Sequence, residues 1–252
     1  MSMIVTTVVP DGIVMAADSA LAAFKMVDMR NFIKGNVSEA MANTAQGTCA
    51  HEKENIVGNT ILSNSVRKLH VMKGNNIAIS EGNQRNTNRG SIAPYIDYFC
   101  NNFHFNDPQS CAFGLFDFIK DLECGVKAEY HVCGYNRSGR IPVPEFWYVN
   151  IKSSMVFNGI GDIKYGINFC AANEYFSQYA DILNKGNIFH YSLQDAVDVS
   201  LFAIEMSMKL ERFIDRDRLI SPPIDLLAIT QSGVKWIQQK ALNTGGGYGS
   251  VC

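Results

Sequence analysis

The sequence contains no C-x-x-C pair, no long apolar run and no long run of charge of one sign. Its seven cysteines are an odd number, and their spacing fits neither a disulfide framework nor a zinc knuckle, so most are expected to be small buried hydrophobic residues. No stretch approaches the ~20 apolar residues of a membrane-spanning helix. The 22 basic and 24 acidic residues leave a net charge of -2 without any one-signed cluster, so neither nucleic acid nor a membrane is expected as a partner.

Metal binding, secretion and division into several domains are also not indicated. One fragment, His51-Glu52-Lys53-Glu54-Asn55, begins like the H-E-x-x-H helix of zinc proteases but has Asn where the second His must bind the metal. No metal or other cofactor is therefore expected. The first residues lack the pattern of a signal peptide, and no linker rich in Pro, Ser or Gly interrupts the 252 residues. We expect one domain, 1–252, in the cytoplasm.

A β-hairpin is predicted at the start of the chain. The β-rich run Ile4–Val9 is broken at Pro10-Asp11-Gly12 and resumes over Ile13–Ala17. A proline stands where the first strand must end, and Gly12 can adopt a positive φ without steric cost. The first strand begins close to Ser2, which would carry the free amine of the chain if Met1 were removed.

Periodicity and turn signals place the other elements. The segment of about 25–60 has no sustained periodicity and is expected to be an insertion, and the Gly-rich tail of about 243–252 is expected to be flexible. Strands are predicted over Ser65–Val71, Ile77–Ser80, Tyr130–Tyr135, Phe146–Ile151, Met155–Phe157, Ile224–Thr230 and Val234–Ile237, and helices over about Ser91–Phe103, Gln109–Leu122, Ile163–Leu183 and Leu193–Ile214.

The order of these elements predicts an α+β fold. Strands are followed by two helices, then strands, two helices and strands again. Strands joined by hairpins exclude an all-parallel doubly wound sheet, because parallel neighbours need long crossover connections. The expected architecture is a four-layer αββα sandwich, in which two antiparallel sheets are flanked by helix pairs.

The nine residues Asp11–Ser19 carry a resemblance to a known family. They read D-G-I-V-M-A-A-D-S and resemble the D-G-V-V-L-A-A-D-S segment of proteasome β-subunits and their bacterial relatives, which are N-terminal nucleophile (Ntn) hydrolases. In active members the nucleophilic Thr lies nine residues before the first Asp of this segment. The residue nine positions before Asp11 is Ser2 in this sequence. The resemblance also implies that Lys68, in Ser65–Leu69, is the catalytic lysine and that Asp18 belongs to the same site.

The resemblance implies further site residues with less specific motifs. The glycine corner that supplies an oxyanion N–H in relatives falls on Gly82, and Ser19 is a supporting residue. Asp217 has close to the spacing of the late catalytic Asp, and Ser221 can stand for the late serine with a shift of one residue.

The chain also departs from the family pattern in three places. Ala20 stands where Arg is usual, Gly159-Ile160-Gly161 replaces a Gly-Ser-Gly, and Ile220-Ser221-Pro222-Pro223 replaces the late Ser-Gly-Gly.

The chemistry of such a site follows from the residue types. A Ser hydroxyl is a weak nucleophile and needs a base, and the α-amine of an N-terminal Ser, with an ordinary pKa of ~8, can accept its proton. A neighbouring Lys68 ammonium would lower the pKa of that amine, and Asp18 would orient and neutralise the lysine. This chemistry requires that Met1 be removed.

Three functions remain open at this stage. The first is a proteasome-like hydrolase that cleaves peptide or amide bonds of a peptide or protein substrate with Ser2. The second is a non-catalytic proteasome-like subunit with a role in assembly, which the three departures favour. The third is an Ntn amidase or acyltransferase that acts on small amides. The resemblance implies a homo-oligomer, as a ring or helical stack, and leaves open whether an ATPase is a partner.

Overall fold

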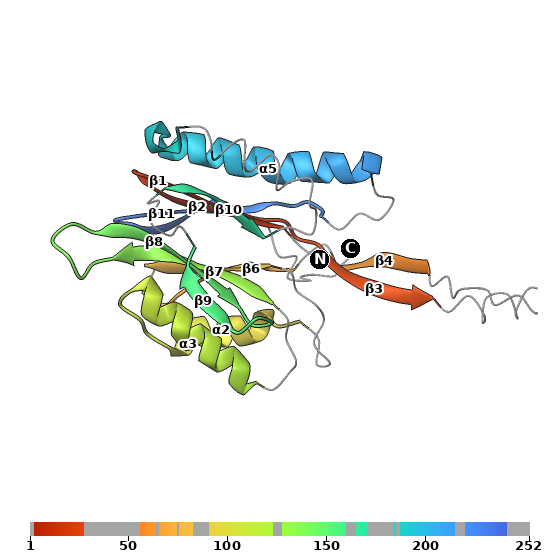
Figure 1. Ribbon diagram of the computed structural model, residues 1–252, viewed down its shortest axis with the longest axis horizontal. Coiled ribbons are helices and arrows are strands. Elements are labelled where there is room, and N and C mark those ends of the chain that lie inside the picture. Colours follow the sequence, from red (N-terminus) through yellow and green to blue (C-terminus); the bar gives the residue numbers. More distant parts are fainter. Residues whose placement is uncertain are drawn as a thin grey trace, which may run out of the picture.

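The computed structural model describes residues 3–27, 56–63, 66–74, 76–82, 91–122, 128–159, 165–170, 184, 187–214 and 220–240. Within these ranges the chain forms two five-stranded antiparallel sheets, a separate two-stranded sheet and three α-helices (Figure 1). The α+β class expected from the order of elements is confirmed.

The N-terminal sheet is built around the predicted hairpin. Strands β1 (Ile4–Val9) and β2 (Gly12–Ala17) pair antiparallel, and every residue of both is buried. The glycine of the turn has a different role from the one expected, because the described glycines with positive φ are Gly74 and Gly233. A Cβ on Gly12 would lie 2.7 Å from the Ile229 carbonyl oxygen, so this glycine is needed for close approach of the next strand. The sheet has the order β10-β1-β2-β11-β12, with β10 at Gly166–Cys170, β11 at Asp225–Thr230 and β12 at Gly233–Gln238.

The second sheet is a meander in which each strand pairs antiparallel with the next along the chain. Its residues alternate between a face toward the N-terminal sheet and a face toward two helices. It consists of β5 (Leu69–Val71), β6 (Ile77–Gly82), β7 (Glu129–Asn136), β8 (Val143–Asn150) and β9 (Met155–Asn158).

Helices cover the outer faces of the two sheets (Figure 1). On the second sheet lie α2 (Ala93–Asn102) and α3 (Pro108–Asp121), and the side chain of Asp107 caps α3 by accepting the backbone N–H of Ser110 at 2.8 Å. On the N-terminal sheet lies α5 (Leu193–Ile214), with a short 3-10 helix before it. The layer order is thus α5, N-terminal sheet, second sheet, then α2 and α3.

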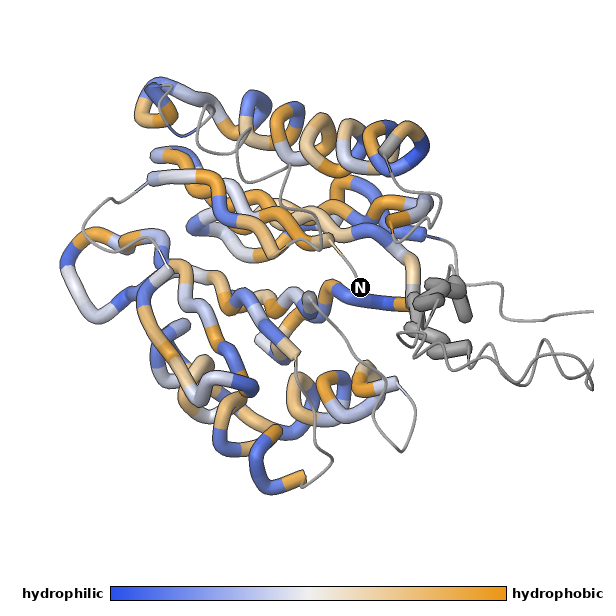
Figure 2. Tube along the Cα trace, turned by 45° about the vertical axis from the view of Figure 1, so that its right-hand side comes forward, coloured by the Kyte–Doolittle hydropathy of each residue, from blue (hydrophilic) through white to orange (hydrophobic). Residues whose placement is uncertain are grey.

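One core cluster fills the space between the two sheets. In this cluster Ile4 and Leu227 of the N-terminal sheet pack with Leu69 and Phe146 of the second sheet, and all four residues are buried. Figure 2 shows the apolar character of the strands that face this layer. One polar contact also crosses it, since Thr6 Oγ1 lies 2.8 Å from Nδ1 of the buried His131.

The helix predicted over Ile163–Leu183 is wrong in its first part. Gly166–Cys170 is strand β10, which pairs with β1 from Ile4↔Cys170 to Val8↔Gly166. This pairing satisfies the outer backbone groups of β1, which a helix could not do. Residues 171–183 lie outside the described residues, so of the two helix pairs expected only α2 and α3 are observed as a pair.

A two-stranded sheet extends from the sandwich next to β2 (Figure 1). It consists of β3 (Leu21–Val27) and β4 (Ile56–Ser63), paired antiparallel from Leu21↔Ser63 to Val27↔Ile56. The segment predicted as an insertion, about 25–60, therefore begins and ends in paired strands. Its centre, 28–55, and the tail of 243–252 lie outside the described residues.

Candidate functional site

The predicted Asp18 and Lys68 form a buried ion pair. Asp18 follows the last residue of β2 and Lys68 precedes the first residue of β5, so the two elements approach the pair from different sheets. The Lys68 Nζ to Asp18 Oδ1 distance is 2.6 Å, and the side chains are 1% and 0% exposed. Because both charged groups are excluded from solvent, the fold itself must hold them in contact, unlike an exposed surface ion pair.

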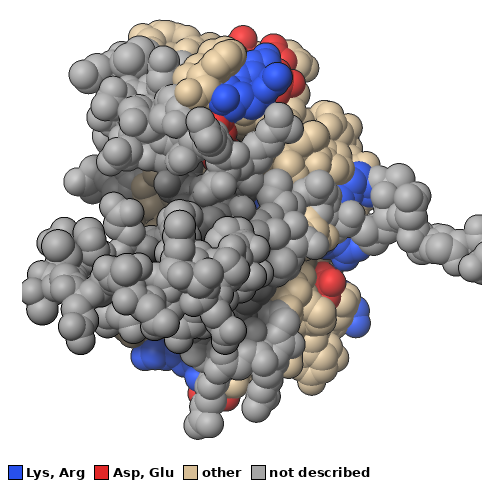
Figure 3. Space-filling model, turned by 90° about the vertical axis from the view of Figure 1, so that its right-hand side faces the viewer, with Lys and Arg blue, Asp and Glu red and all other residues tan. Residues whose placement is uncertain are grey.

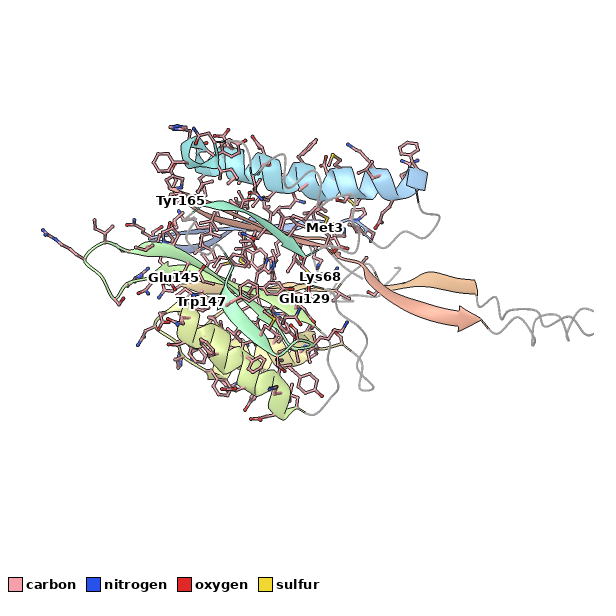
Figure 4. All side chains as sticks on the ribbon, viewed as in Figure 1. Met3, Lys68, Glu129, Glu145, Trp147 and Tyr165 are labelled. Carbon is pink, nitrogen blue, oxygen red and sulfur yellow. The ribbon has the colours of Figure 1, made fainter. Side chains whose placement is uncertain are left out.

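The start of the described chain is bonded to the same carboxylate. The backbone N–H of Met3 donates to Asp18 Oδ1 at 2.8 Å, and the N–H of Asp18 donates to the Met3 carbonyl at 3.2 Å. Figure 4 shows Met3 and Lys68 at the end of the sandwich from which β3 leaves. Ser2 lies outside the described residues, but its neighbour is fixed to the ion pair.

The other oxygen of Asp18 is held by backbone donors. Oδ2 accepts the N–H of Ala20 at 2.9 Å and the N–H of Ser221 at 3.3 Å. The carboxylate thus receives one ammonium and three N–H groups, which compensate its removal from water. Its position is therefore defined by β1, by its own turn and by the segment before β11.

Burial is the strongest influence on the protonation of Lys68. It lowers the pKa of the ammonium below its ordinary value of 10.5, because removal from water disfavours the charged form. The carboxylates of Asp18 and Glu81 oppose this and raise the pKa, whereas the ammonium of Lys240 lowers it further. The net direction is downward, so this lysine gives up its proton more readily than one on the surface.

The two predicted serines support the turn that carries Asp18. The N–H of Ser19 donates to the Ser221 carbonyl at 3.1 Å, and the Ser19 hydroxyl donates to the Pro223 carbonyl. The Ser221 hydroxyl lies 3.4 Å from the Pro222 carbonyl, a weak contact. The structure therefore brings Ser19 and Ser221 to Asp18 through backbone hydrogen bonds.

Gly82 ends β6 at the same end of the space between the sheets. A Cβ at this position would lie 2.9 Å from Cys170 Sγ and 3.0 Å from Ile4 Cδ1, so an added side chain would have to displace these side chains of β10 and β1. The thiol of Cys170 in turn contacts the carboxylate of Glu129, the residue paired with Gly82. Donation of the Gly82 N–H to an oxyanion stays a prediction.

The expected late catalytic residue Asp217 cannot be placed, and Gly159 lies away from the Asp18–Lys68 pair. Asp217 lies outside the described residues, although Ile220, just beyond it, donates its N–H to Glu211 Oε2 at 3.0 Å. Gly159, the first residue of the segment matched to Gly-Ser-Gly, directly follows β9 of the second sheet and donates its N–H to the Phe146 carbonyl at 2.9 Å. The strand that pairs with β1 on the side away from β2 is β10, so Gly159 is not part of the N-terminal sheet.

A second buried ion pair was missed by sequence reasoning. Lys240 Nζ lies 2.6 Å from Asp225 Oδ2 and 2.7 Å from Ser19 Oγ, and its side chain is 5% exposed. No motif surrounds Lys240, which lies three residues beyond the strand predicted over Val234–Ile237. A cavity of about 200 Å³ adjoins the pair and is lined by Arg67, Asp225, Gln239 and Lys240.

Two other kinds of feature are not found in the described residues. The described ranges contain no group of three or more His, Cys, Asp or Glu residues that could hold a metal ion. No helix in the described part of the chain is long and apolar enough to span a bilayer. Among the described atoms visible at the end from which β3 leaves, basic and acidic side chains both occur (Figure 3).

The arrangement of sheets and helices is the proteasome-like fold, as comparison with solved structures shows. Among solved structures the chain is similar to a Gly-1 mutant of Anbu from Hyphomicrobium sp. strain MC1, with a TM-score of 0.57, 12% identity, and coverage of 95% of this chain and 86% of that one. It is similar also to Anbu, an ancestral beta-subunit, from Yersinia bercovieri, with a TM-score of 0.57, 11% identity, and coverage of 94% and 87%. No family model and no curated protein matches. At such low identity the likeness establishes the fold alone.

Proposed function

We propose that this protein is a proteasome-like amide-bond hydrolase whose nucleophile is Ser2 after removal of Met1. One observation carries the proposal, namely the hydrogen bond from the Met3 N–H to the carboxylate of the buried Asp18–Lys68 pair. It fixes the residue after Ser2 at 2.8 Å from a carboxylate that also binds a lysine of lowered pKa. Perturbed ionisable groups of this kind are typical of catalytic sites.

The proposed reaction uses groups of this chain throughout. The free α-amine of Ser2 takes the proton from its own Oγ, which attacks the carbonyl carbon of the substrate amide. The oxyanion accepts the Gly82 N–H, and the amine returns the proton to the leaving nitrogen as the C–N bond breaks. Water then attacks the ester, with the amine again as base, and releases the acid and the free Ser2. Lys68 favours the neutral amine, and Asp18 holds Lys68.

The test is labelling by a small β-lactone, which acylates activated hydroxyls, followed by intact-mass analysis. The native chain should lack Met1 and gain one adduct that maps to residue 2. Ser2→Ala should gain none, and Lys68→Met should react at least ~10-fold more slowly, because it loses the charge that favours the neutral amine. Lys209→Met is the matched control, since Lys209 is an exposed lysine whose Nζ lies 3.8 Å from the exposed Glu205. A native chain that retains Met1 or reacts no faster than Ser2→Ala would disprove the hydrolase.

A non-catalytic subunit is the second candidate. It is favoured by Ala20, which supplies only a backbone N–H to Asp18 at the position where relatives usually have Arg. Under this proposal the ion pair is a structural remnant, and the chain keeps the fold for assembly. An unreactive chain that forms a defined homo-oligomer by light scattering would support it. An amidase on small amides shares the chemistry of the first proposal and differs from it in substrate, and an acyltransferase differs also in that an acceptor other than water takes the acyl group from Ser2. A peptide or protein substrate, an oligomeric state and a cytoplasmic location remain parts of the first proposal.

A further inference from the structure

Lys240 is a fully bonded buried ammonium. It follows β12 by two residues, and its Nζ contacts three acceptors, at 2.6 Å from Asp225 Oδ2, 2.7 Å from Ser19 Oγ and 2.6 Å from the Val66 carbonyl. Asp225 is 1% exposed, and its Oδ1 accepts the backbone N–H of Lys240 at 2.8 Å. An ammonium has three donors, and each has a partner here.

These acceptors lie on the segments that carry the candidate site. Ser19 is the residue after Asp18, and Val66 is two residues before Lys68. Asp225 begins β11, next to the segment that holds Asp18 through Ser221. The segments are also bonded to one another, since the Val66 N–H donates to the Ser19 carbonyl at 3.2 Å. One side chain thus ties the Asp18 turn, the approach to Lys68 and the start of β11 together.

We propose that Lys240 is a positioning residue of the candidate site, which fixes the Asp18 turn against the segment of Lys68 through Ser19, Val66 and Asp225. This inference rests on the proposed function for its catalytic meaning, but the arrangement can be tested without any activity. Lys240 does not contact the reacting atoms in this scheme. It acts by setting where Asp18 and Lys68 meet and by adding a positive charge behind them.

The charge of Lys240 provides a readout that simple packing would not. The charged groups that act on Lys68 are Asp18, Glu81 and Lys240, and Lys240 is the one that lowers the pKa of Lys68 by like-charge repulsion. Removal of the Lys240 charge should therefore raise the pKa of Lys68. A residue that only filled space would leave this pKa unchanged when replaced by one of similar length.

The experiment compares Lys240→Met, Lys240→Arg and the double variant Lys240→Met/Asp225→Asn in the full chain. The double variant removes both charges and so avoids an unpaired buried carboxylate, which could prevent folding of the single variant. The pKa of Lys68 is followed by NMR of lysine labelled at Cε, with the Lys68→Met spectrum for assignment. We expect it to rise in Lys240→Met, and to rise less in the double variant because the Asp225 carboxylate is lost together with the ammonium. It should keep its native value in Lys240→Arg and in Lys209→Met.

The β-lactone reaction supplies the second readout. We expect the folded double variant to label at least ~10-fold more slowly than the native chain, and Lys240→Arg to recover most of the rate. A Lys68 pKa and a labelling rate equal to those of Lys209→Met would overturn the positioning role. If the native chain itself is not labelled, the proposed hydrolase activity is refuted. The titration of Lys68 still decides whether Lys240 positions Asp18 and Lys68.

Discussion

Replacement of Asp18 by Ala tests whether the candidate site is held by its buried carboxylate. The change leaves the Lys68 ammonium buried without its partner at 2.6 Å and removes the acceptor of three backbone N–H groups. An unpaired buried charge typically costs 3 to 5 kcal/mol, so we expect the free energy of unfolding to fall by about 4 kcal/mol. That is a large part of the stability of an ordinary domain, about 5 to 15 kcal/mol.

A double-mutant cycle separates the pair from its surroundings. Lys68→Met leaves Asp18 with its three N–H donors and should cost less than Asp18→Ala. The double variant removes the unpaired charge, so it should be more stable than Asp18→Ala alone, with a coupling energy of about 2 kcal/mol. Urea unfolding, followed by circular dichroism, measures each corner, and Glu205→Ala at the exposed pair should change stability by less than ~0.5 kcal/mol. Additive effects of the two changes would refute the buried pair.

Three further changes have definite expectations. Burial lowers the pKa of His131 from 6.5 to about 3, so below pH ~6.5 the unfolded chain binds a proton that the folded chain does not. The free energy of unfolding should therefore decrease as the pH is lowered, by up to ~1.4 kcal/mol per pH unit, and His131→Gln should lack this decrease when urea unfolding is compared at pH 7 and pH 5. Gly82→Ala places a Cβ 2.9 Å from Cys170 Sγ and should cost about 1 to 3 kcal/mol of unfolding free energy. Asp107→Ala removes the α3 cap and should cost about 1 kcal/mol by the same assay.

Each of these expectations has a result that contradicts it. An equal pH slope in His131→Gln would show that other groups set the acid sensitivity. Gly139→Ala is the control for Gly82, since its Cβ would meet only the Ile141 carbonyl at 3.7 Å, and equal costs at the two positions would refute close approach as the reason for Gly82. An unchanged unfolding midpoint in Asp107→Ala would mean that the cap contributes nothing to α3.

Local signals in the sequence predict most of the sandwich. The turn after Val9, the helix predicted from about Gln109 and the strand predicted over Tyr130–Tyr135 depend on neighbours along the chain, and all three elements are found where expected. Strand β10 was missed because its five residues gain their order from pairing with β1, more than 150 residues away. Such pairing leaves little local trace, and the helix-like spacing that continues beyond it dominated the prediction.

The residues of the candidate site also differ in whether the sequence around them carries a recognisable pattern. Asp18 could be found because it lies in the nine-residue segment that resembles a family, and Lys68 because it follows at a known place in that pattern. The structure brings the two side chains together as an ion pair at 2.6 Å. Lys240 has no motif, and its role depends on the return of β12 to the start of the chain. The role of Gly12 was also misjudged, because the approach of Ile229 cannot be read from a turn.

The central proposal is that the amine of Ser2 serves as a base and that Lys68 lowers its pKa, so the pKa of this amine is the most direct test. The measurement is a pH titration of the α-amine by 15N NMR in the chain without Met1, repeated in Lys68→Met. We expect a pKa below the ordinary ~8 in the native chain and a rise toward it in Lys68→Met, because the like charge is then removed. An ordinary value in both proteins would contradict the account, as would a chain from which Met1 is never removed.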